Sequence, residues 1–159
     1  MDTPLDPQAL NQLFIEARTH SHWQNKEVSD ELLKQLYDLC KWGPTSMNCS
    51  PMRLVFVRSH AAKEQLKPLL SAGNVEKTMS APVTAIVASD HQFYEHFPLL
   101  FPHSTTARDR FANDQTATDI TAFRNSSLQG AYLIIAARSL GLDCGPMSGF
   151  DNEALDKVS

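Results

Sequence analysis

The stretch Trp42 to Arg58, WGPTSMNCSPMRLVFVR, limits the possible folds of this chain more than any other. It follows apolar residues at helical spacing and leads directly into an apolar run. Its two prolines cannot continue a helix, because proline lacks an N–H donor and clashes with the preceding turn. Its Ser and Asn side chains hydrogen-bond well in tight turns. The stretch therefore predicts a polar loop between a helix and a strand. Such a loop suits a small planar ligand, and it is also typical of an ordinary connection.

Length and composition predict one globular domain over residues 1–159. The chain is 42% hydrophobic and 20% charged, which is typical of a globular protein with a sizeable core. A net charge of −4 argues against binding nucleic acid through a basic surface. No apolar run is long enough to span a membrane, and the acidic start MDTPLDPQAL is unlike a signal peptide. Three cysteines without paired spacing favour a reducing compartment, so we expect a cytoplasmic protein.

Two helices are expected before the loop. Asp6 is a good N-cap residue, and Pro7 suits the first helical position. Ser29 caps the second helix. The face of that helix expected to be buried consists of Leu32, Leu33, Leu36, Leu39 and Cys40.

Further helices are expected after the loop. One runs from about Ala61 to Leu70, and the longest runs from Asp119 to Leu140, with Gly141 as its C-terminal cap. Asp151 caps a last, short helix. The longest helix is rich in small residues that permit close helix packing, which makes it a candidate oligomer interface. These residues include Ser126, Ser127, Gly130 and Ala131.

The strands are few. Leu54 to Val57 is a continuous apolar run, which predicts a strand buried on both faces, and Val83 to Ala88 predicts a second strand. Because so small a sheet is poorly supported, either the loops contain further strands or a terminal strand is missing from the chain. The aromatic segment His91 to His103 is either a lid over a site or a cluster that covers the core.

Two polar segments are candidate binding elements. Arg18 suits bidentate recognition of phosphate or carboxylate, with His20 as a second donor. The same cations also suit the C-terminus of a helix. Asn74 and Lys77 are three residues apart, so on a helix they share a face that either grips a polar ring or is merely solvated. His20 and His22 lack a third ligand at a recognisable spacing, so no metal site is predicted.

The loop from Leu142 to Phe150 has glycines on either side of Pro146, which let the backbone come close to a ligand. Cys49 is a candidate nucleophile if it has a thiolate of low pKa and a nearby His as base. Nothing in the spacing supplies that base, so no catalytic side chain is predicted.

These segments together resemble the FMN-dependent nitroreductases, and in particular the branch that contains the malonic semialdehyde reductase of pyrimidine catabolism. The resemblance covers essentially the whole chain in the family's order. It is carried by ARTHSHW (17–23), KWGPTSMNCSP (41–51), SAGNVEKTMSAPV (71–83) and TAFRNSSLQGAYLIIAARSLGLDCGPMSGFD (121–151).

The resemblance implies an α+β, three-layer fold whose central, mainly antiparallel sheet is flanked by helices, in an intertwined homodimer with FMN at the interface. Arg18 and His20 would hold the FMN phosphate. Ser46 and Asn48 would contact the flavin from the partner subunit. Asn74 and Lys77 would approach the ring and the ribityl chain. The ring would be lined near its reactive nitrogen by Pro146, Met147 and Ser148.

The implied activity passes hydride from NAD(P)H through FMN to a small acceptor, which would be an aldehyde of the malonic semialdehyde type, a nitro compound or a quinone. Lys77 would stabilise negative charge on the reduced flavin. Two departures stand out. His22 occupies a position that is often basic in the family, and the chain ends before the family's last strand and terminal basic residues. It therefore resembles a C-terminally truncated member, and the alternative function is a non-catalytic flavin-binding homologue.

Overall fold

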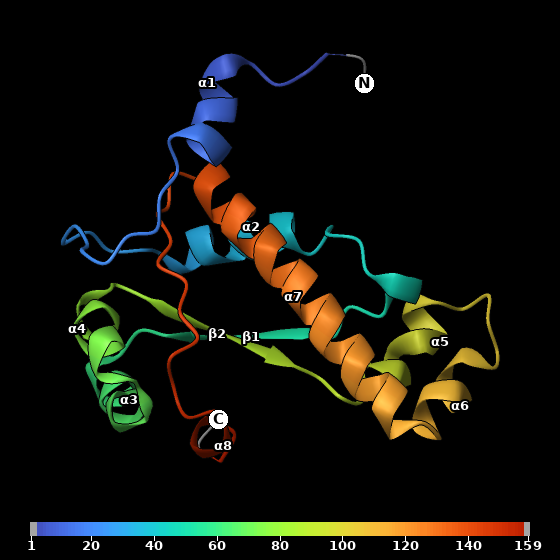
Figure 1. The fold of residues 1–159 in the computed structure, drawn as a ribbon. Coiled ribbons are helices and arrows are strands. Elements are labelled where there is room, and N and C mark those ends of the chain that lie inside the picture. Colours follow the sequence, from blue (N-terminus) through green and yellow to red (C-terminus); the bar gives the residue numbers. More distant parts are fainter. Residues whose placement is uncertain (1–2, 158–159) are drawn as a thin grey trace. The chain divides into compact units, whose positions relative to one another are not determined.

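A computed structural model describes residues 3–157 of the protein. The chain has an α+β fold with a small antiparallel sheet. Figure 1 shows the elements, which are α1 (Pro7–Leu10), η1 (Asn11–Ile15), α2 (Asp30–Cys40), η2 (Ser46–Asn48), β1 (Met52–Val57), α3 (His60–Leu66), η3 (Lys67–Leu69), α4 (Ala72–Ser80), β2 (Thr84–Ser89), η4 (Phe93–His96), α5 (Phe97–Leu100), α6 (Ala107–Ala112), α7 (Gln115–Ser139) and α8 (Asn152–Leu155). None of the helices in this part of the chain is both long and apolar enough to cross a membrane.

The chain divides into two compact units, which we call unit 1 and unit 2. The described residues of unit 1 are 3–33, 56–86 and 137–157, and those of unit 2 are 34–55 and 87–136. The boundaries fall inside α2, β1, β2 and α7, so each of these elements contributes residues to both units. The prediction of a single domain over residues 1–159 stays a prediction.

The expected helix starts are confirmed by their hydrogen bonds. The Asp6 carboxylate accepts from the Ala9 N–H at 3.0 Å, and the Ser29 hydroxyl accepts from the Leu32 N–H at 3.2 Å. Asp151 caps α8 in the same way through the Ala154 N–H at 3.0 Å. Each cap satisfies an N–H that the first turn of a helix leaves without an internal partner. The first helix changes to π-helical geometry after Leu10 and ends at Ile15.

The longest helix begins four residues earlier than expected, at Gln115, and ends as predicted at a glycine cap. Gly141 has φ = +75°, a left-handed conformation that suits glycine. The Leu142 N–H donates to the Ala137 carbonyl at 2.9 Å, and the Gly141 N–H donates to the Arg138 carbonyl at 3.1 Å. This pair of bonds is the Schellman arrangement, which satisfies the last carbonyls of the helix.

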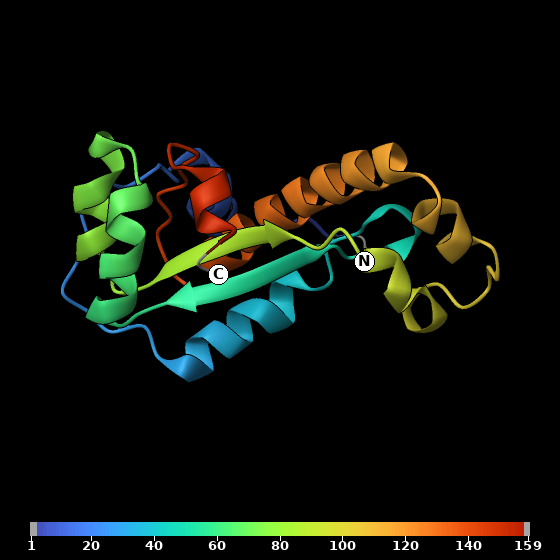
Figure 2. The same ribbon diagram turned by 90° about the horizontal axis from the view of Figure 1, so that it is seen from below.

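The two strands pair antiparallel (Figure 2), and the Asp90 N–H extends the pairing to the Pro51 carbonyl at 2.8 Å. The expectation that residues 54–57 are buried on both faces was wrong, because Val55 is 47% exposed. Side chains of a strand alternate between its faces, and an apolar run does not reveal which faces the rest of the chain covers. Val87 of β2, which belongs to unit 2, is likewise exposed.

The buried stripe of α2 is narrower than expected. Leu33, Leu36 and Cys40 are buried at helical spacing, whereas Leu39 is 47% exposed and was wrongly assigned to this face. Leu39 lies about 100° around the helix from Cys40 and about 60° from Leu36, which places it beside the stripe. An apolar residue beside a buried stripe is not necessarily part of it.

The aromatic segment that was either a lid or a core cover forms the core of unit 2. Phe93 and Phe97 are almost completely buried with Phe111, and the three rings meet edge to face at centroid distances of 5.1 to 5.9 Å. Cys49 belongs to the same cluster, and Met47 packs against it. The loop that follows α2 is therefore anchored on this core.

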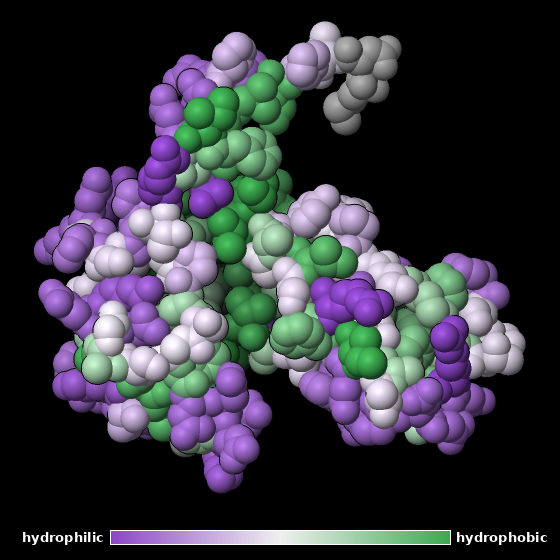
Figure 3. Space-filling model, in the orientation of Figure 1, coloured by the Kyte–Doolittle hydropathy of each residue, from purple (hydrophilic) through white to green (hydrophobic). Residues whose placement is uncertain are grey.

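In unit 1, the segment α1–η1 presents apolar residues to the surface. Leu13 is buried, but Phe14 and Ile15 are 56% and 66% exposed. Figure 3 shows hydrophobic residues over this segment. An exposed apolar patch of this kind is a candidate interaction surface.

Candidate functional site

Seven of the nine predicted site residues lie in unit 1, namely Arg18, His20, Asn74, Lys77, Pro146, Met147 and Ser148. The other two, Ser46 and Asn48, lie in unit 2. The predicted site residues therefore form two groups, and each has its own supporting contacts.

The segment with Arg18 and His20 runs beside the loop 144–149. Thr19 and Cys144 form a parallel bridge, and the His20 N–H donates to the Cys144 carbonyl at 3.0 Å. A Cβ on Gly145 would lie 2.3 Å from the His20 carbonyl oxygen. Only glycine fits there, so the close approach of the two segments depends on the residue type at position 145.

Helix α4, which carries Asn74 and Lys77, is attached to the other end of that loop. The Asn74 Nδ2 donates to the Gly149 carbonyl at 3.0 Å, and the Ser71 N–H donates to the same oxygen at 2.9 Å. The Thr78 hydroxyl contacts the Met147 sulfur at 3.5 Å. The side-chain N–H₂ group of Asn74 thus donates to the loop, and its side-chain oxygen can accept a hydrogen bond from another group.

The two cations among the predicted site residues of unit 1, Arg18 and Lys77, differ in exposure. Arg18 is exposed, and its Nη1 donates to the Ile15 and Ala17 carbonyls at 2.8 Å each, which holds the guanidinium against its own segment. Lys77 is half-buried. Within the described ranges of unit 1, the carboxylate ion pairs involve His20, Arg58, His60 and Lys67, and none involves Arg18 or Lys77.

His20 faces a carboxylate. Its Nε2 lies 3.6 Å from Asp143 Oδ1, and the side chains are 42% and 70% exposed. An exposed pair of this kind is weak, because water screens both groups. An anion bound at His20 would therefore either replace the Asp143 carboxylate as the partner of His20 or lie close to its negative charge.

The loop of unit 2 that carries Ser46 and Asn48 has an unusual backbone. Met47, Asn48 and Ser50 have φ values of 54°, 51° and 39°, in the left-handed region. Such conformations cost free energy for residues other than glycine and persist only where surrounding contacts hold them. Backbone strain of this kind is typical of ligand-binding loops.

Three hydrogen bonds hold this loop in place. The Ser46 N–H donates to Oδ1 of Asn125, a residue of α7 that is 2% exposed, at 2.8 Å. The Ser50 N–H donates to the Thr45 hydroxyl at 3.0 Å, and the Asn48 Nδ2 donates to the Leu100 carbonyl at 2.8 Å. The Ser46 hydroxyl and the Asn48 carboxamide oxygen are on exposed residues, available to a ligand.

The cysteines are poor nucleophiles in this environment. Cys49 is 1% exposed, and burial raises the pKa of its thiol above the usual range. Burial likewise raises the pKa of Cys40 and Cys144. A nucleophilic cysteine needs the opposite shift, so the arrangement disfavours covalent catalysis through Cys49. As for metals, residues 3–157 contain no group of three or more His, Cys, Asp or Glu side chains that could hold an ion.

Comparison with known proteins identifies the family. The family model described as "Nitroreductase family" matches residues 15–159. A protein of Polynucleobacter asymbioticus, named for NADH dehydrogenase/NAD(P)H nitroreductase activity, is 60% identical over all of this chain and 79% of its own length. The chain belongs to the nitroreductase family.

Solved structures show the same nitroreductase fold at lower identity. One from Exiguobacterium sibiricum, named as a nitroreductase in complex with FMN, has a TM-score of 0.81 at 19% identity and covers 98% of this chain and 80% of its own. One from Staphylococcus epidermidis, named as an NAD(P)H:FMN oxidoreductase, has a TM-score of 0.83 at 19% identity, with 94% and 78% covered. At these identities the comparison establishes the fold alone.

Two residues of this nitroreductase-family chain were not predicted from the sequence but support the predicted site residues. Asn125 holds the backbone of Ser46, and Trp23 donates its indole N–H to the Lys77 carbonyl at 2.8 Å. Trp23 is the last residue of the ARTHSHW motif, so the sequence contained a signal that could have identified it. Asn125 lies within the motif that begins TAFRNSSLQ at residue 121, but nothing in that motif singled it out.

Proposed function

We propose that the protein is an FMN-dependent oxidoreductase that uses NAD(P)H. One observation carries the proposal. Three segments that are far apart in sequence, at 18–20, 74–77 and 144–149, meet through direct hydrogen bonds within unit 1. Between them they offer an exposed guanidinium, an ammonium, an amide oxygen and a glycine-bounded loop, which is the donor set that a phosphorylated planar cofactor requires.

The residues present fit this group. Arg18 offers a planar cation for a phosphate. Gly145, which has no side chain, lets the loop 144–149 lie close enough to His20 for the His20 N–H to bond to the Cys144 carbonyl. When bound, FMN supplies hydride transfer, which no side chain of this chain can perform by itself.

Each proposed residue then has a task. Arg18 and His20 bind the phosphate. Lys77 stabilises the negative charge that develops at the ring on reduction, as a fixed cation should. Asn74 orients the ribityl chain and the ring edge. Pro146, Met147 and Ser148 line the ring face and exclude water from it.

We further propose a homodimer with the three-layer, intertwined arrangement, in which Ser46 and Asn48 reach the flavin of the other copy. The exposed apolar residues support this proposal. Phe123 of α7 is 73% exposed, Ile120 and Leu128 of the same helix are each 50% exposed, and Ile15 of η1 is 66% exposed. A monomer would leave all of these in water, whereas a second copy would bury them.

The proposed acceptor is small. The motifs GPTSMNCSP and GPMSGFD resemble those of the malonic semialdehyde reductase branch, so an aldehyde of that type is the first candidate. Nitro compounds and quinones are the alternatives.

The test begins with the purified protein. A bound flavin gives a yellow protein with a flavin absorbance spectrum, at about one FMN per chain. NADH and NADPH are then compared as reductants, with malonic semialdehyde, a nitroaromatic compound and a quinone as acceptors. Flavin binding without turnover of any acceptor would favour a non-catalytic flavin-binding homologue. A colourless protein that takes up no added FMN would refute the proposal.

A further inference from the structure

Trp23 connects the two segments of unit 1 that carry Lys77 and the residues Pro146 to Ser148. Its indole N–H donates to the Lys77 carbonyl oxygen at 2.8 Å. The far edge of the same ring is so close to the loop that a Cβ on Gly145 would lie 3.0 Å from Trp23 Cη2. The half-buried Trp23 side chain thus contacts both the turn that carries Lys77 and Gly145, the first residue of the stretch Gly145 to Ser148, which we call the GPMS loop.

The indole N–H provides a second hydrogen bond to the Lys77 carbonyl oxygen. The Lys77 carbonyl already accepts the Ala81 N–H at 3.2 Å, within the last turn of α4. A carbonyl oxygen has two lone pairs, so the indole occupies the second. Loss of the indole N–H therefore leaves no buried backbone acceptor without a partner, and its cost to folding is expected to be small. What it removes is an anchor on the backbone of Lys77 itself.

The other anchors of α4 do not involve residue 77, although the hydroxyl of the next residue, Thr78, contacts the Met147 sulfur at 3.5 Å. Asn74 is attached to Gly149 near the start of the helix, and the Lys63 ammonium donates to the Ala81 carbonyl at its C-terminus. Only Trp23, among the described side chains with a hydrogen bond to this helix from another segment, bonds at residue 77. The backbone of Lys77 is therefore held from outside the helix by this bond, beside the contact of Thr78 with Met147.

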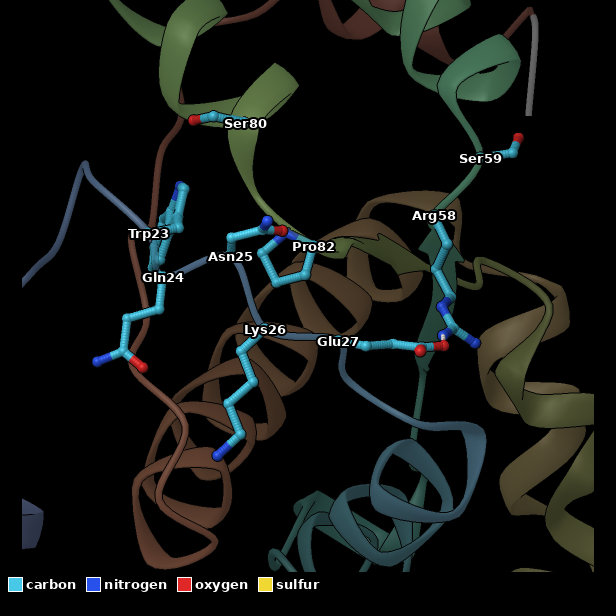
Figure 4. A pocket seen from close by; sticks show the side chains of 9 residues that line it. All are labelled: Trp23, Gln24, Asn25, Lys26, Glu27, Arg58, Ser59, Ser80 and Pro82. Atoms are coloured by element: carbon cyan, nitrogen blue, oxygen red, sulfur yellow. Dashed lines mark hydrogen bonds and ion pairs between the residues drawn. The ribbon is translucent and has the colours of Figure 1, made fainter.

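The ring also borders a hollow. Trp23 lines a hollow of about 730 Å³ in unit 1, whose wall includes Lys26, Arg58, Ser80 and Pro82 (Figure 4). The edge of the same ring lies against Gly145. A small side chain at position 23 would extend the hollow toward Gly145.

We propose that Trp23 is a positioning residue that sets the place of the Lys77 ammonium through its backbone and holds the GPMS loop against the same turn. The inference rests on the proposed function, in which Lys77 acts on the bound flavin ring. Trp23 itself touches neither reductant nor acceptor in this proposal. Its effect should therefore appear in the electrostatics of the flavin site.

The experiment compares the midpoint potential of bound FMN in the wild type, Trp23→Phe, Lys77→Met and the double variant. Trp23→Phe keeps an aromatic ring but loses the N–H. We expect both single variants to lower the potential, and Trp23→Phe to change the ratio of reduced to oxidised bound FMN by about two- to tenfold, the factor for one hydrogen bond. In the double variant we expect no shift beyond that of Lys77→Met, since residues that act through one another are not additive.

Trp42→Phe is the matched control, because Trp42 is 77% exposed and should leave the potential unchanged. If Trp23→Phe does not fold, Trp23→Leu, whose side chain carries no hydrogen-bond donor, gives the same comparison. A wild-type potential in Trp23→Phe or an additive double variant would overturn the inference while the proposed function stands. No shift in Lys77→Met would overturn the inference together with the role proposed for Lys77, while FMN binding and turnover would still stand. A wild type that binds no FMN would overturn both the inference and the proposed function.

Discussion

At the scale of single residues, the space around a glycine decides what the loop 144–149 tolerates. Gly145 lies against the backbone of His20, and a Cβ on Gly149 would lie 2.7 Å from Asn74 Nδ2. Backbone cannot yield as a flexible side chain can, so position 145 is the stricter of the two. Gly73 in α4 is the opposite case, with nothing within 4 Å of an added Cβ.

This difference predicts opposite effects of the same substitution. Gly145→Ala should lower the free energy of unfolding by about 1–3 kcal/mol, the cost of overpacking, and should weaken FMN binding by moving the loop. Gly73→Ala should raise the free energy of unfolding by about 0.4–1 kcal/mol, because it reduces the freedom of the unfolded chain inside a helix. Urea unfolding of both variants measures the two values. Equal effects would show that the contact with His20 does not limit position 145.

Arg18 provides a second prediction at this scale. Arg18→Ala should weaken FMN binding by about 1.5–3 kcal/mol, the range for hydrogen bonds to charged groups. Riboflavin, which lacks the phosphate, should bind the variant and the wild type almost equally. Fluorescence titration with both ligands measures this, and Lys26→Ala is a control for the loss of an exposed cation in the same unit. A parallel loss of riboflavin affinity would contradict the phosphate assignment.

At the scale of elements, the C-terminus of α4 is closed by a buried lysine. Lys63 of α3 is 4% exposed, and its ammonium donates to the Ala81 carbonyl, at the cap of α4. A cation suits the C-terminus of a helix. Burial nevertheless lowers the pKa of Lys63 below its usual value, because desolvation penalises the charged form.

The lowered pKa predicts a pH dependence with a definite sign. Between the folded-state pKa and the ordinary value near 10.5, the unfolded chain binds more protons at position 63 than the folded chain does. Stability from this group therefore rises as pH rises through that window, and is lowest below the folded-state pKa. Lys63→Met should remove this slope. Chemical unfolding of both proteins from pH 7 to 10 checks it, and parallel curves would show that Lys63 is not desolvated in the folded state.

At the scale of the whole molecule, the longest helix divides its small residues between two environments. Ser126 is 4% exposed, so it faces the interior, whereas Gly130 is half-buried beside the exposed Val87 of β2. Ser127 and Ala131 are exposed. The small residues therefore do not share one face, and the large apolar residues of α7 are the better probes of an oligomer interface.

Phe123→Glu should dissociate the proposed homodimer. Placing a carboxylate where a 73% exposed ring is expected to be covered by a second copy costs several kcal/mol if the charge is buried unpaired. Phe123→Leu keeps the position apolar and should remain dimeric. Sedimentation velocity measures the oligomeric state, and absorbance at the flavin maximum measures occupancy. A monomeric Phe123→Glu protein with full FMN occupancy would contradict a site that needs residues from both subunits.

Much of the local structure was predictable from the sequence, whereas the assignment of the site residues to a cofactor stays a prediction. Asp6, Ser29 and Asp151 start helices as expected, and Gly141 ends one, because caps depend on a few neighbouring residues. The segments of the family motif were also identifiable, since each is contiguous. The exposure of Leu39 and Val55 was not predictable, because burial depends on which distant segments cover a face.

By itself, then, the sequence determined the caps, the turns and the family to which the chain belongs, since these depend on residues close together in the chain or on short motifs. Only the tertiary structure decided that Trp23 bonds to Lys77, that Asn125 holds Ser46, and that the aromatic segment 93–101 is a core. Each of these contacts joins residues far apart in sequence, and a hydrogen bond or a packed ring exists only where folding brings its partners within a few ångströms. No local pattern encodes that distance.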